Sequence, residues 1–225
     1  MFQKVLKKIA VSLFLISTAA ISGVEIGGTR LIYNGSSSQA AISVSNPDNT
    51  PYLIQSWVSN SENSDDGDSA FITTPPLFKL NPHAQNSVRV MLTGSAPPQD
   101  RESVYWLNIK SIPSSSADAK NELLIAVKSK MKVFYRPTGL KGDASLAYQQ
   151  LTFSAAGGKL TVHNPPPYSV SLYDVNVNGK KLAKPPMVLP FQTLSLSQSA
   201  VTSSKVSWRA INDFGGITAE HKFNI

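Results

Sequence analysis

The chain has 225 residues and no cysteine, and its 21 Lys and Arg against 14 Asp and Glu give a formal net charge of +7. The lack of cysteine excludes disulfides and thiol chemistry. The lysines are dispersed, unlike the basic face on which nucleic-acid-binding proteins concentrate their charge, although the positive excess still favours an acidic partner.

Residues 1–22 have the features of a secretory signal peptide. Three lysines form a basic head, an apolar run covers residues 9–16, and the small residues Ala20 and Ser22 precede a suitable cleavage site. The run is shorter than the ~18 to 20 residues that a membrane span needs, so we predict a cleaved leader and not an anchor. Removing it lowers the formal charge from +7 to +4 and leaves 203 residues, which suits two domains of ~100 residues.

The remaining chain has the pattern of an all-β protein, with short strands separated by turn residues and no sustained helical period. Expected strands are residues 29–33, 40–44, 52–58, 87–92, 105–109 and 123–135, then 151–153, 159–163, 169–177, 193–196 and 205–212. The dipeptide Asn178-Gly179 predicts a tight hairpin. The pattern favours two immunoglobulin-like β-sandwich domains, residues 23–137 and 146–225, with a linker at 138–145.

Two further segments have more than one interpretation. Residues 59–69 gather acidic side chains beside Gly67, but they lack the spacing of a calcium loop, which favours a solvated hairpin loop. The Thr74-Pro75 bond is left open between cis and trans, because X–Pro bonds adopt both forms.

The sequence shows no motif of an enzyme. His83, His163 and His221 lie in no spacing that binds zinc. No nucleophile elbow, phosphate-binding glycine loop or dinucleotide fingerprint occurs. We therefore predict no catalytic residues, no metal and no cofactor.

The strand predicted at 123–135 has one apolar and one basic row. Because side chains alternate across a strand, Leu123, Ile125 and Val127 share one face. The opposite face carries Lys128, Lys130, Lys132 and Arg136. A core strand with a solvated outer face would have the same pattern, so the pattern alone leaves the role of the strand open.

Six phrases are spread over nearly the whole chain after the leader. They are T-R-L-I-Y-N-G (29–35), T-P-P-L-F-K-L-N-P (74–82), D-R-E-S-V-Y-W-L-N-I-K-S-I-P (100–113), K-M-K-V-F-Y-R-P (130–137), N-P-P-P-Y (164–168) and I-N-D-F-G-G (211–216). No single phrase is decisive, but the set and its order are specific. The chain resembles the PapD-like and FimC-like periplasmic chaperones of the chaperone–usher pilus pathway.

The resemblance implies a boomerang-shaped periplasmic protein that binds pilus subunits and delivers them to an outer-membrane usher. Such subunits lack their last strand, and the chaperone donates one of its own. On this basis Leu123, Ile125 and Val127 would enter the subunit groove. By motif match, Arg30 and Lys132 would bind the subunit's C-terminal carboxylate, with Lys130 as the rival of Lys132.

The resemblance also implies a salt-bridge cluster between the domains, formed by Glu102, Arg136 and Asp213. A partly buried cluster of this kind fixes the domain angle more than it adds stability, because desolvation offsets much of the attraction.

Strict alternation places Lys132 on the face opposite to Ile125, so a bulge, strong twist or contact with different parts of the subunit must reconcile them.

Two other functions are weighed against the chaperone. A secreted β-sandwich structural or carbohydrate-binding adhesive protein would expose a patch of aromatic side chains, whereas Trp57, Trp106 and Trp208 stand in alternating contexts typical of a core. An enzyme with a site outside the known motifs comes third. Apolar edge strands also make a self-dimer of the free protein plausible.

Overall fold

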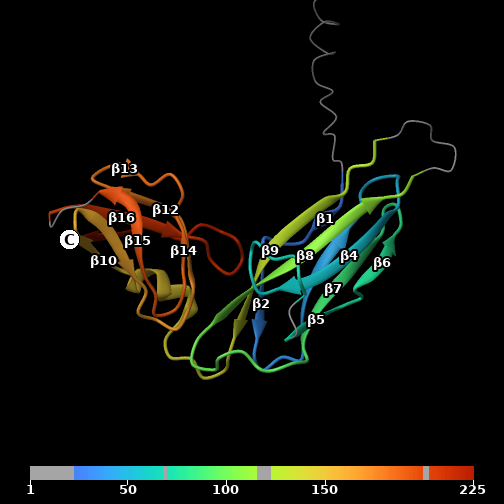
Figure 1. The fold of residues 1–225 in the computed structure, drawn as a ribbon, viewed down its shortest axis with the longest axis horizontal. Coiled ribbons are helices and arrows are strands. Elements are labelled where there is room, and N and C mark those ends of the chain that lie inside the picture. The colour runs from blue at the N-terminus through green and yellow to red at the C-terminus, as the bar shows by residue number, and fades with distance from the viewer. Residues whose placement is uncertain (1–22, 68–69, 116–122, 200–202) are drawn as a thin grey trace, which may run out of the picture.

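The computed structural model describes residues 23–67, 70–115, 123–199 and 203–225, so the predicted signal peptide lies outside the described residues. Two β-sandwich domains meet at an angle and give the molecule a bent outline (Figure 1). This is the all-β, two-domain architecture expected from the sequence. Within the described part of the chain, no helix has the length and apolar character needed to span a membrane.

The N-terminal sandwich consists of two sheets. The first has the order β1-β3-β7-β5, with β1 (Glu25–Ile26), β3 (Ala40–Ser45), β7 (Gln85–Leu92) and β5 (Phe71–Thr74). The second has the order β2-β9-β8-β4-β6, with β2 (Arg30–Asn34), β9 (Val127–Arg136), β8 (Ser103–Pro113), β4 (Tyr52–Ser59) and β6 (Leu77–Leu80). Apolar side chains of alternate positions face inward and form one core, which includes Tyr33, Val44, Val88, Leu107 and Val133.

The C-terminal sandwich also has two sheets. One consists of β10 (Thr152–Ala156), β11 (Lys159–His163) and β15 (Thr193–Ser199). The other has β13 (Lys180–Lys181), β12 (Val170–Val177), β16 (Lys205–Ala210) and β17 (His221–Asn224), with β14 (Met187–Val188) paired to β12. A short 3-10 helix, η2 (Ala144–Gln150), follows the connection from the N-terminal domain.

Turn chemistry explains both a correct and a missed prediction. Asn178 and Gly179 have φ of 50° and 82° and join β12 to β13 as the tight hairpin predicted. The strands β5 and β6 were missed because Pro75 and Pro76 separate them, and the Thr74-Pro75 bond between them is cis.

The central strand is shorter than predicted, since β9 begins only at Val127 and residues 123–126 are not in a strand. The prediction was wrong for those residues because the sequence pattern cannot show where the pairing with a neighbouring strand stops. The pairing with β8 stops at Ser111↔Val127, and the pairing with β2 begins at Arg30↔Lys132. Residues 123–126 therefore lie outside the pairing of the sheet, although β8 itself continues to Pro113.

The C-terminal core is organised around Trp208, which is fully buried as predicted. Its ring centroid lies 4.6 Å from that of Phe153, and its Nε1 donates a 2.8 Å hydrogen bond to the carbonyl oxygen of Tyr148. This bond ties η2 to β16. It also satisfies a buried indole donor that would otherwise be costly.

We expect Trp208→Phe to lower the free energy of unfolding by about 1 to 3 kcal/mol, because it leaves the Tyr148 carbonyl without its donor. Chemical denaturation followed by circular dichroism measures this. Trp57→Phe is a matched control, since no acceptor among the described residues contacts the buried Nε1 of Trp57. An equal loss in both variants would show that ring volume, and not the hydrogen bond, is responsible.

Candidate functional site

The two neighbours of β9 leave part of its edge open. β8 pairs with it antiparallel over its length, but β2 pairs with it in parallel only from Arg30↔Lys132 to Asn34↔Arg136. On the β2 side, residues 127–131 therefore have no strand partner within the described part of the chain. An open edge presents backbone donors and acceptors that can pair with another strand.

An apolar row extends the open edge. Leu123 is 83% exposed, Ile125 65% and Val127 55%. Exposed apolar side chains of this size and in this number are a feature of interaction sites. Further along the same face of β9 as Val127, Met131 and Val133 are buried in the N-terminal core, so Val127 is the exposed end of a face whose other end is already packed.

The structure limits the ways in which Lys132 and the apolar row, on opposite faces of the strand, could contact the same partner. The register between β9 and β8 is unbroken from Val127 to Tyr135. A bulge within this range is therefore excluded as the explanation. Twist or contacts with different parts of a partner remain, and Lys132 projects from the face opposite to Val127.

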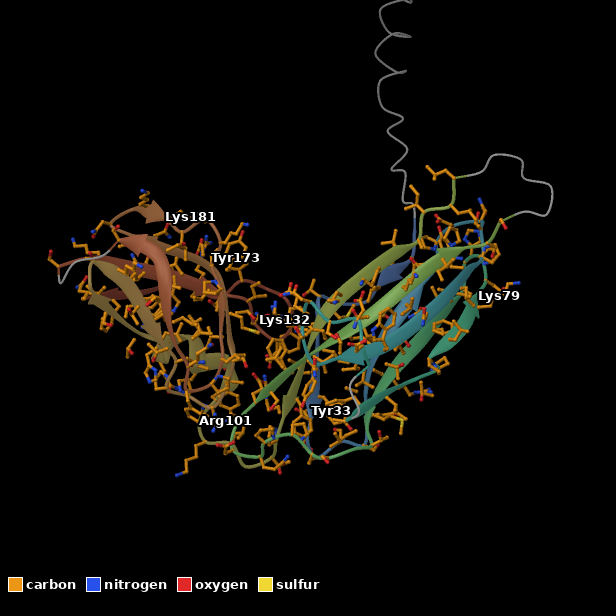
Figure 2. The ribbon with its side chains drawn as sticks, viewed as in Figure 1. Tyr33, Lys79, Arg101, Lys132, Tyr173 and Lys181 are labelled. Atoms are coloured by element: carbon orange, nitrogen blue, oxygen red, sulfur yellow. The ribbon has the colours of Figure 1, made fainter. Side chains whose placement is uncertain are left out.

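Arg30 and Lys132 are direct neighbours across the β2–β9 pairing, and Figure 2 shows Lys132 between the two domains. The Arg30 guanidinium lies 5.5 Å from the Phe134 ring, and Lys132 Nζ lies 5.0 Å from the Trp106 ring. Trp106 is only partly buried beside this cation, and Trp57 is also only partly buried, so the prediction of both as core residues was wrong.

In the described part of the chain, Arg30 and Lys132 stand apart from the salt bridges. Among the described residues, no carboxylate forms an ion pair with Arg30 or Lys132. Burial lowers the pKa of both groups, although the charges of Asp213 and Glu102 act in the other direction on Arg30, and that of Glu62 on Lys132. The charge of Arg30 adds to the lowering at Lys132. Two half-buried like charges side by side are unfavourable, and an incoming carboxylate would relieve this repulsion.

The structure separates Lys130 from Lys132. Lys130 Nζ donates to the carbonyl oxygens of Glu62 at 2.5 Å and Ser64 at 3.1 Å, while Lys128 Nζ lies 2.6 Å from Asp65 Oδ1. Residues 60–67 of this loop are exposed apart from the partly buried Ser64, so the loop is solvated as predicted, although it contacts the basic row of β9. It joins β4 to β5, which belong to different sheets, so the prediction of a hairpin was wrong. Opposite charges in the two segments were the available signal for this contact.

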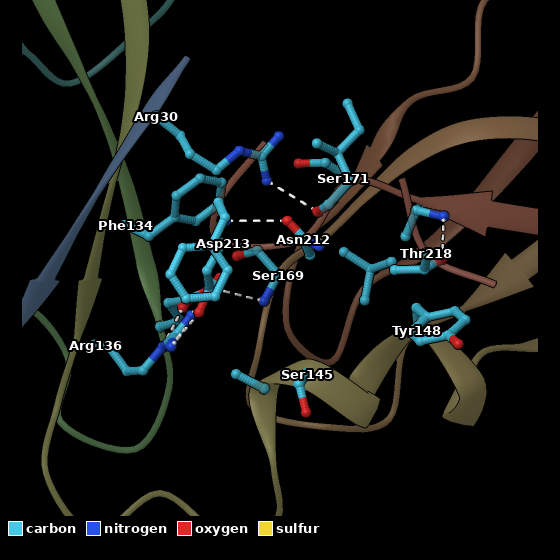
Figure 3. A pocket seen from close by; sticks show the side chains of 16 residues that line it. Arg30, Phe134, Arg136, Ser145, Tyr148, Ser169, Ser171, Asn212, Asp213 and Thr218 are labelled. Atoms are coloured by element: carbon cyan, nitrogen blue, oxygen red, sulfur yellow. Dashed lines mark hydrogen bonds and ion pairs between the residues drawn. The ribbon is translucent and has the colours of Figure 1, made fainter. Parts of the chain in front are cut away.

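The three residues of the expected interdomain cluster lie in contact. Arg136 Nε donates to Glu102 Oε1 at 2.8 Å, and its two terminal nitrogens donate to Asp213 at 2.7 and 3.0 Å. Glu102 Oε2 also accepts from the Ser169 N–H at 2.9 Å. Figure 3 shows these bonds joining the two domains. Arg136 comes from β9, so the strand with the open edge also carries the link to the C-terminal domain.

Burial and charge oppose each other in this cluster. Glu102 is 3% exposed, and burial raises its pKa, although the charge of Arg136 and the Ser169 N–H act in the other direction. Burial alone would lower the pKa of Arg136, but the hydrogen bond to Asp213 and the charge of Glu102 together raise it. Glu102 and Arg136 therefore each favour the charged form of the other, and the pair restricts the domain angle more than it adds stability.

A cavity of about 160 Å³ lies at the hinge, lined from the N-terminal domain by Arg30 and Phe134 and from the C-terminal domain by Ser169, Ser171 and Asn212 (Figure 3). Arg30 Nη1 crosses to the carbonyl oxygen of Ile211 at 3.0 Å. Ser169 and Ser171 lie in strand-like sequence without any motif, so their place at the site could not be predicted from the sequence.

Comparison with known proteins places both domains in one family. Residues 23–141 match the N-terminal domain of PapD, described as a pili and flagellar-assembly chaperone, and residues 146–222 match the C-terminal domain of the pili assembly chaperone PapD. The chain belongs to the PapD family of pilus-assembly chaperones.

Individual relatives agree with this assignment. The probable fimbrial chaperone LpfB of Escherichia coli O157:H7 is 42% identical over 92% of this chain and 90% of its own length. The structure of the Salmonella enterica SafA pilin in complex with the SafB chaperone matches with a TM-score of 0.81 and 32% identity, covering 92% of this chain and 99% of the matched one. The periplasmic chaperone SfaE matches with a TM-score of 0.77 and 33% identity, covering 90% and 100%.

Family membership decides between the functions that the sequence left open. The protein is a periplasmic fimbrial chaperone of the chaperone–usher pathway and not an enzyme. The alternative of a secreted adhesive β-sandwich has no support from these matches. Family membership does not assign roles to individual residues, which depend on the contacts and exposure of their side chains in this chain.

We expect Arg136→Ala to lower the free energy of unfolding by about 3 to 5 kcal/mol, because it leaves Glu102 buried without its cation. Asp213→Asn is the matched control and should cost about 1 kcal/mol or less, since Asp213 is partly exposed. Urea denaturation measures both values. Small-angle X-ray scattering of the folded Arg136→Ala variant should show a wider spread of domain angles, and an unchanged profile would contradict a role in fixing the angle.

Proposed function

We propose that this chaperone captures pilus subunits by donating the open edge of β9 and the apolar row before it. The observation that carries the proposal is the juxtaposition of three features: an unpartnered strand edge, the exposed row of Leu123, Ile125 and Val127, and two unneutralised cations at the end of that edge. The SafA pilin in the matched SafA–SafB structure is bound by a chaperone of this family.

The apolar row supplies the affinity in this proposal. Burial of each of its side chains in a groove of the subunit contributes ~1.5 to 3 kcal/mol, so the row as a whole contributes several kcal/mol. Backbone hydrogen bonds to the open edge set the register, because strand addition pairs the main chains directly. Residues 123–126, which are unpaired and not in a strand in the free chain, would become strand when a subunit supplies the missing partner.

The Arg30–Lys132 pair fixes where the added strand of the subunit ends along β9. Its two cations are already partly removed from water and form no ion pair with a carboxylate of the described residues, so much of their desolvation cost is met before binding. A subunit's C-terminal carboxylate would form charge-assisted hydrogen bonds with them, which are roughly twice as strong as neutral ones. Lys130 is a weaker candidate because Glu62 and Ser64 already accept its hydrogen bonds.

The cluster of Glu102, Arg136 and Asp213 holds the two domains at the angle that shapes this site. Arg136 shares β9 with Lys132, so movement of the C-terminal domain would be transmitted to the strand that binds the subunit.

We also propose delivery to an outer-membrane usher. The outer face of β4 and β6, where Leu53 and Leu77 are exposed, lies away from β9 and would stay accessible while a subunit covers the open edge.

A self-dimer of the free protein is a further part of the proposal. The exposed row and the open edge are self-complementary in the sense that one strand edge can pair with another. Pairing of two copies through this edge would cover the apolar side chains until a subunit arrives, and the subunit would then compete with the second copy.

We expect Lys132→Ala to reduce subunit capture at least tenfold while leaving thermal stability unchanged, because a half-buried, unneutralised cation is lost. Lys130→Ala is the matched control and should retain capture. The measurement is co-purification of the tagged mature chaperone with periplasmic subunits identified by mass spectrometry, beside thermal unfolding of each variant. Loss of capture in the control alone would transfer the anchoring role to Lys130.

A second variant tests strand donation independently of the anchor. Ile125→Asp places a charge in the proposed groove, so we expect loss of subunit binding by more than tenfold, since burying an unpaired carboxylate is costly. Folding should be unaffected, because Ile125 is mostly exposed in the free chain. Lys79→Asp, on the outer face of β6, is a control for added negative charge. Full capture by a folded Ile125→Asp variant would rule out strand donation by this row.

A further inference from the structure

Phe214 is 97% exposed, the most exposed of the large apolar side chains in the described residues. It lies at the tip of the loop between β16 and β17, which is closed by the Ile211↔Ile217 bridge. Figure 1 shows this loop reaching from the C-terminal domain toward the N-terminal domain. Ile217, beside it, is also exposed.

The loop that carries Phe214 is held by its own hydrogen bonds. The Asn212 side-chain oxygen accepts from the N–H groups of Phe214 at 3.0 Å and Gly216 at 2.9 Å. The Asn212 N–H donates to the Gly216 carbonyl oxygen at 2.8 Å. The backbone beneath the exposed ring is therefore fixed and does not gain freedom from exposure.

Contacts with the N-terminal domain hold the loop on both sides of Phe214. Before it, Asp213 bonds Arg136. After it, Gly215 approaches Thr29 so closely that a Cβ at this glycine would lie 2.7 Å from Thr29 Oγ1, with a φ of +84° that also favours glycine. An exposed aromatic on so constrained a loop is pre-organised for a contact, because little conformational entropy is lost when it is covered.

The position of the loop indicates what would cover the ring. Phe214 and Arg30 line the same hinge cavity, and Arg30 bonds the Ile211 carbonyl at the base of the loop. The loop that carries Phe214 thus adjoins the site that we propose for the subunit's terminal carboxylate. A segment of the subunit that ends at Arg30 and Lys132 would pass close to Phe214.

We propose that Phe214 is a specificity-determining contact for the captured subunit, packing against an apolar side chain in the segment that leads to its C-terminal carboxylate. This inference rests on the proposed capture of subunits at the same cleft. It gives the C-terminal domain a direct part in binding: β9 contributes the strand and the cations, and the loop at 211–217 contributes an aromatic anchor of the kind that dominates interface energetics.

The test uses the subunit that co-purifies with the parent chaperone, once identified by mass and produced with each variant. Its release is measured by exchange into an excess of labelled parent chaperone. We expect Phe214→Ala to accelerate release roughly tenfold and Phe214→Leu to change it about threefold or less. Thermal stability should be unchanged, because a ring that is 97% exposed contributes little to folding.

Phe191→Ala is the control for loss of a surface phenylalanine, since Phe191 is 44% exposed and lines a different pocket with residues 165–167. It should release the subunit at the parent rate. Parent-like release from Phe214→Ala, while Lys132→Ala and Ile125→Asp still impair capture, would overturn this inference and leave the proposed function intact. Full capture by all three variants would overturn the proposed function itself.

Substitutions in the subunit identify the side chain that Phe214 contacts. Replacing the apolar residues of the subunit's C-terminal segment one at a time by Ala should give one change whose effect is much smaller in Phe214→Ala than in the parent. Additive effects at every position would contradict the contact even if Phe214→Ala alone accelerated release.

Discussion

The offset between the two pairings of β9 is the constraint on which the rest of this structure depends. β8 covers one side of the strand from Val127 onward, whereas the parallel partner β2 joins the other side only at Lys132. That offset leaves a strand edge open in a domain whose other strands are paired into two sheets. It also brings Arg30 to the side of Lys132, since the first residue pair of the parallel ladder consists of these two cations.

Several features that would be unfavourable in an ordinary surface gather around this edge. An apolar row is exposed, two cations stand together without a counter-ion among the described residues, and an aromatic ring projects from the facing domain. Natural proteins keep such local conflicts mainly where function requires them. Each conflict would be relieved by one ligand: a chain that brings a strand, an apolar face and a terminal carboxylate.

The domain interface is as important as the edge itself. Arg136 lies at the end of β9 and bonds both Glu102 and Asp213, so one side chain joins β9, the residue directly before β8 and the C-terminal loop. The same loop carries Phe214. The geometry of the cleft, and with it the distance between the cations and the aromatic tip, therefore depends on a cluster whose members are costly to bury separately.

Sequence by itself determined the fold class, the family resemblance and the identity of the central strand. Alternation of apolar residues and turn signals such as Asn178-Gly179 are local properties, and these can be read without knowledge of partners. The sequence phrases that resemble the family also singled out Arg30, Lys132, Glu102, Arg136 and Asp213. Only the tertiary structure decided where β9 begins, because the limit is set by where its pairing with β8 stops, at Ser111↔Val127. It likewise decided that the acidic loop engages Lys130 and that Phe214 stands exposed at the cleft, since both depend on contacts between segments far apart in the chain.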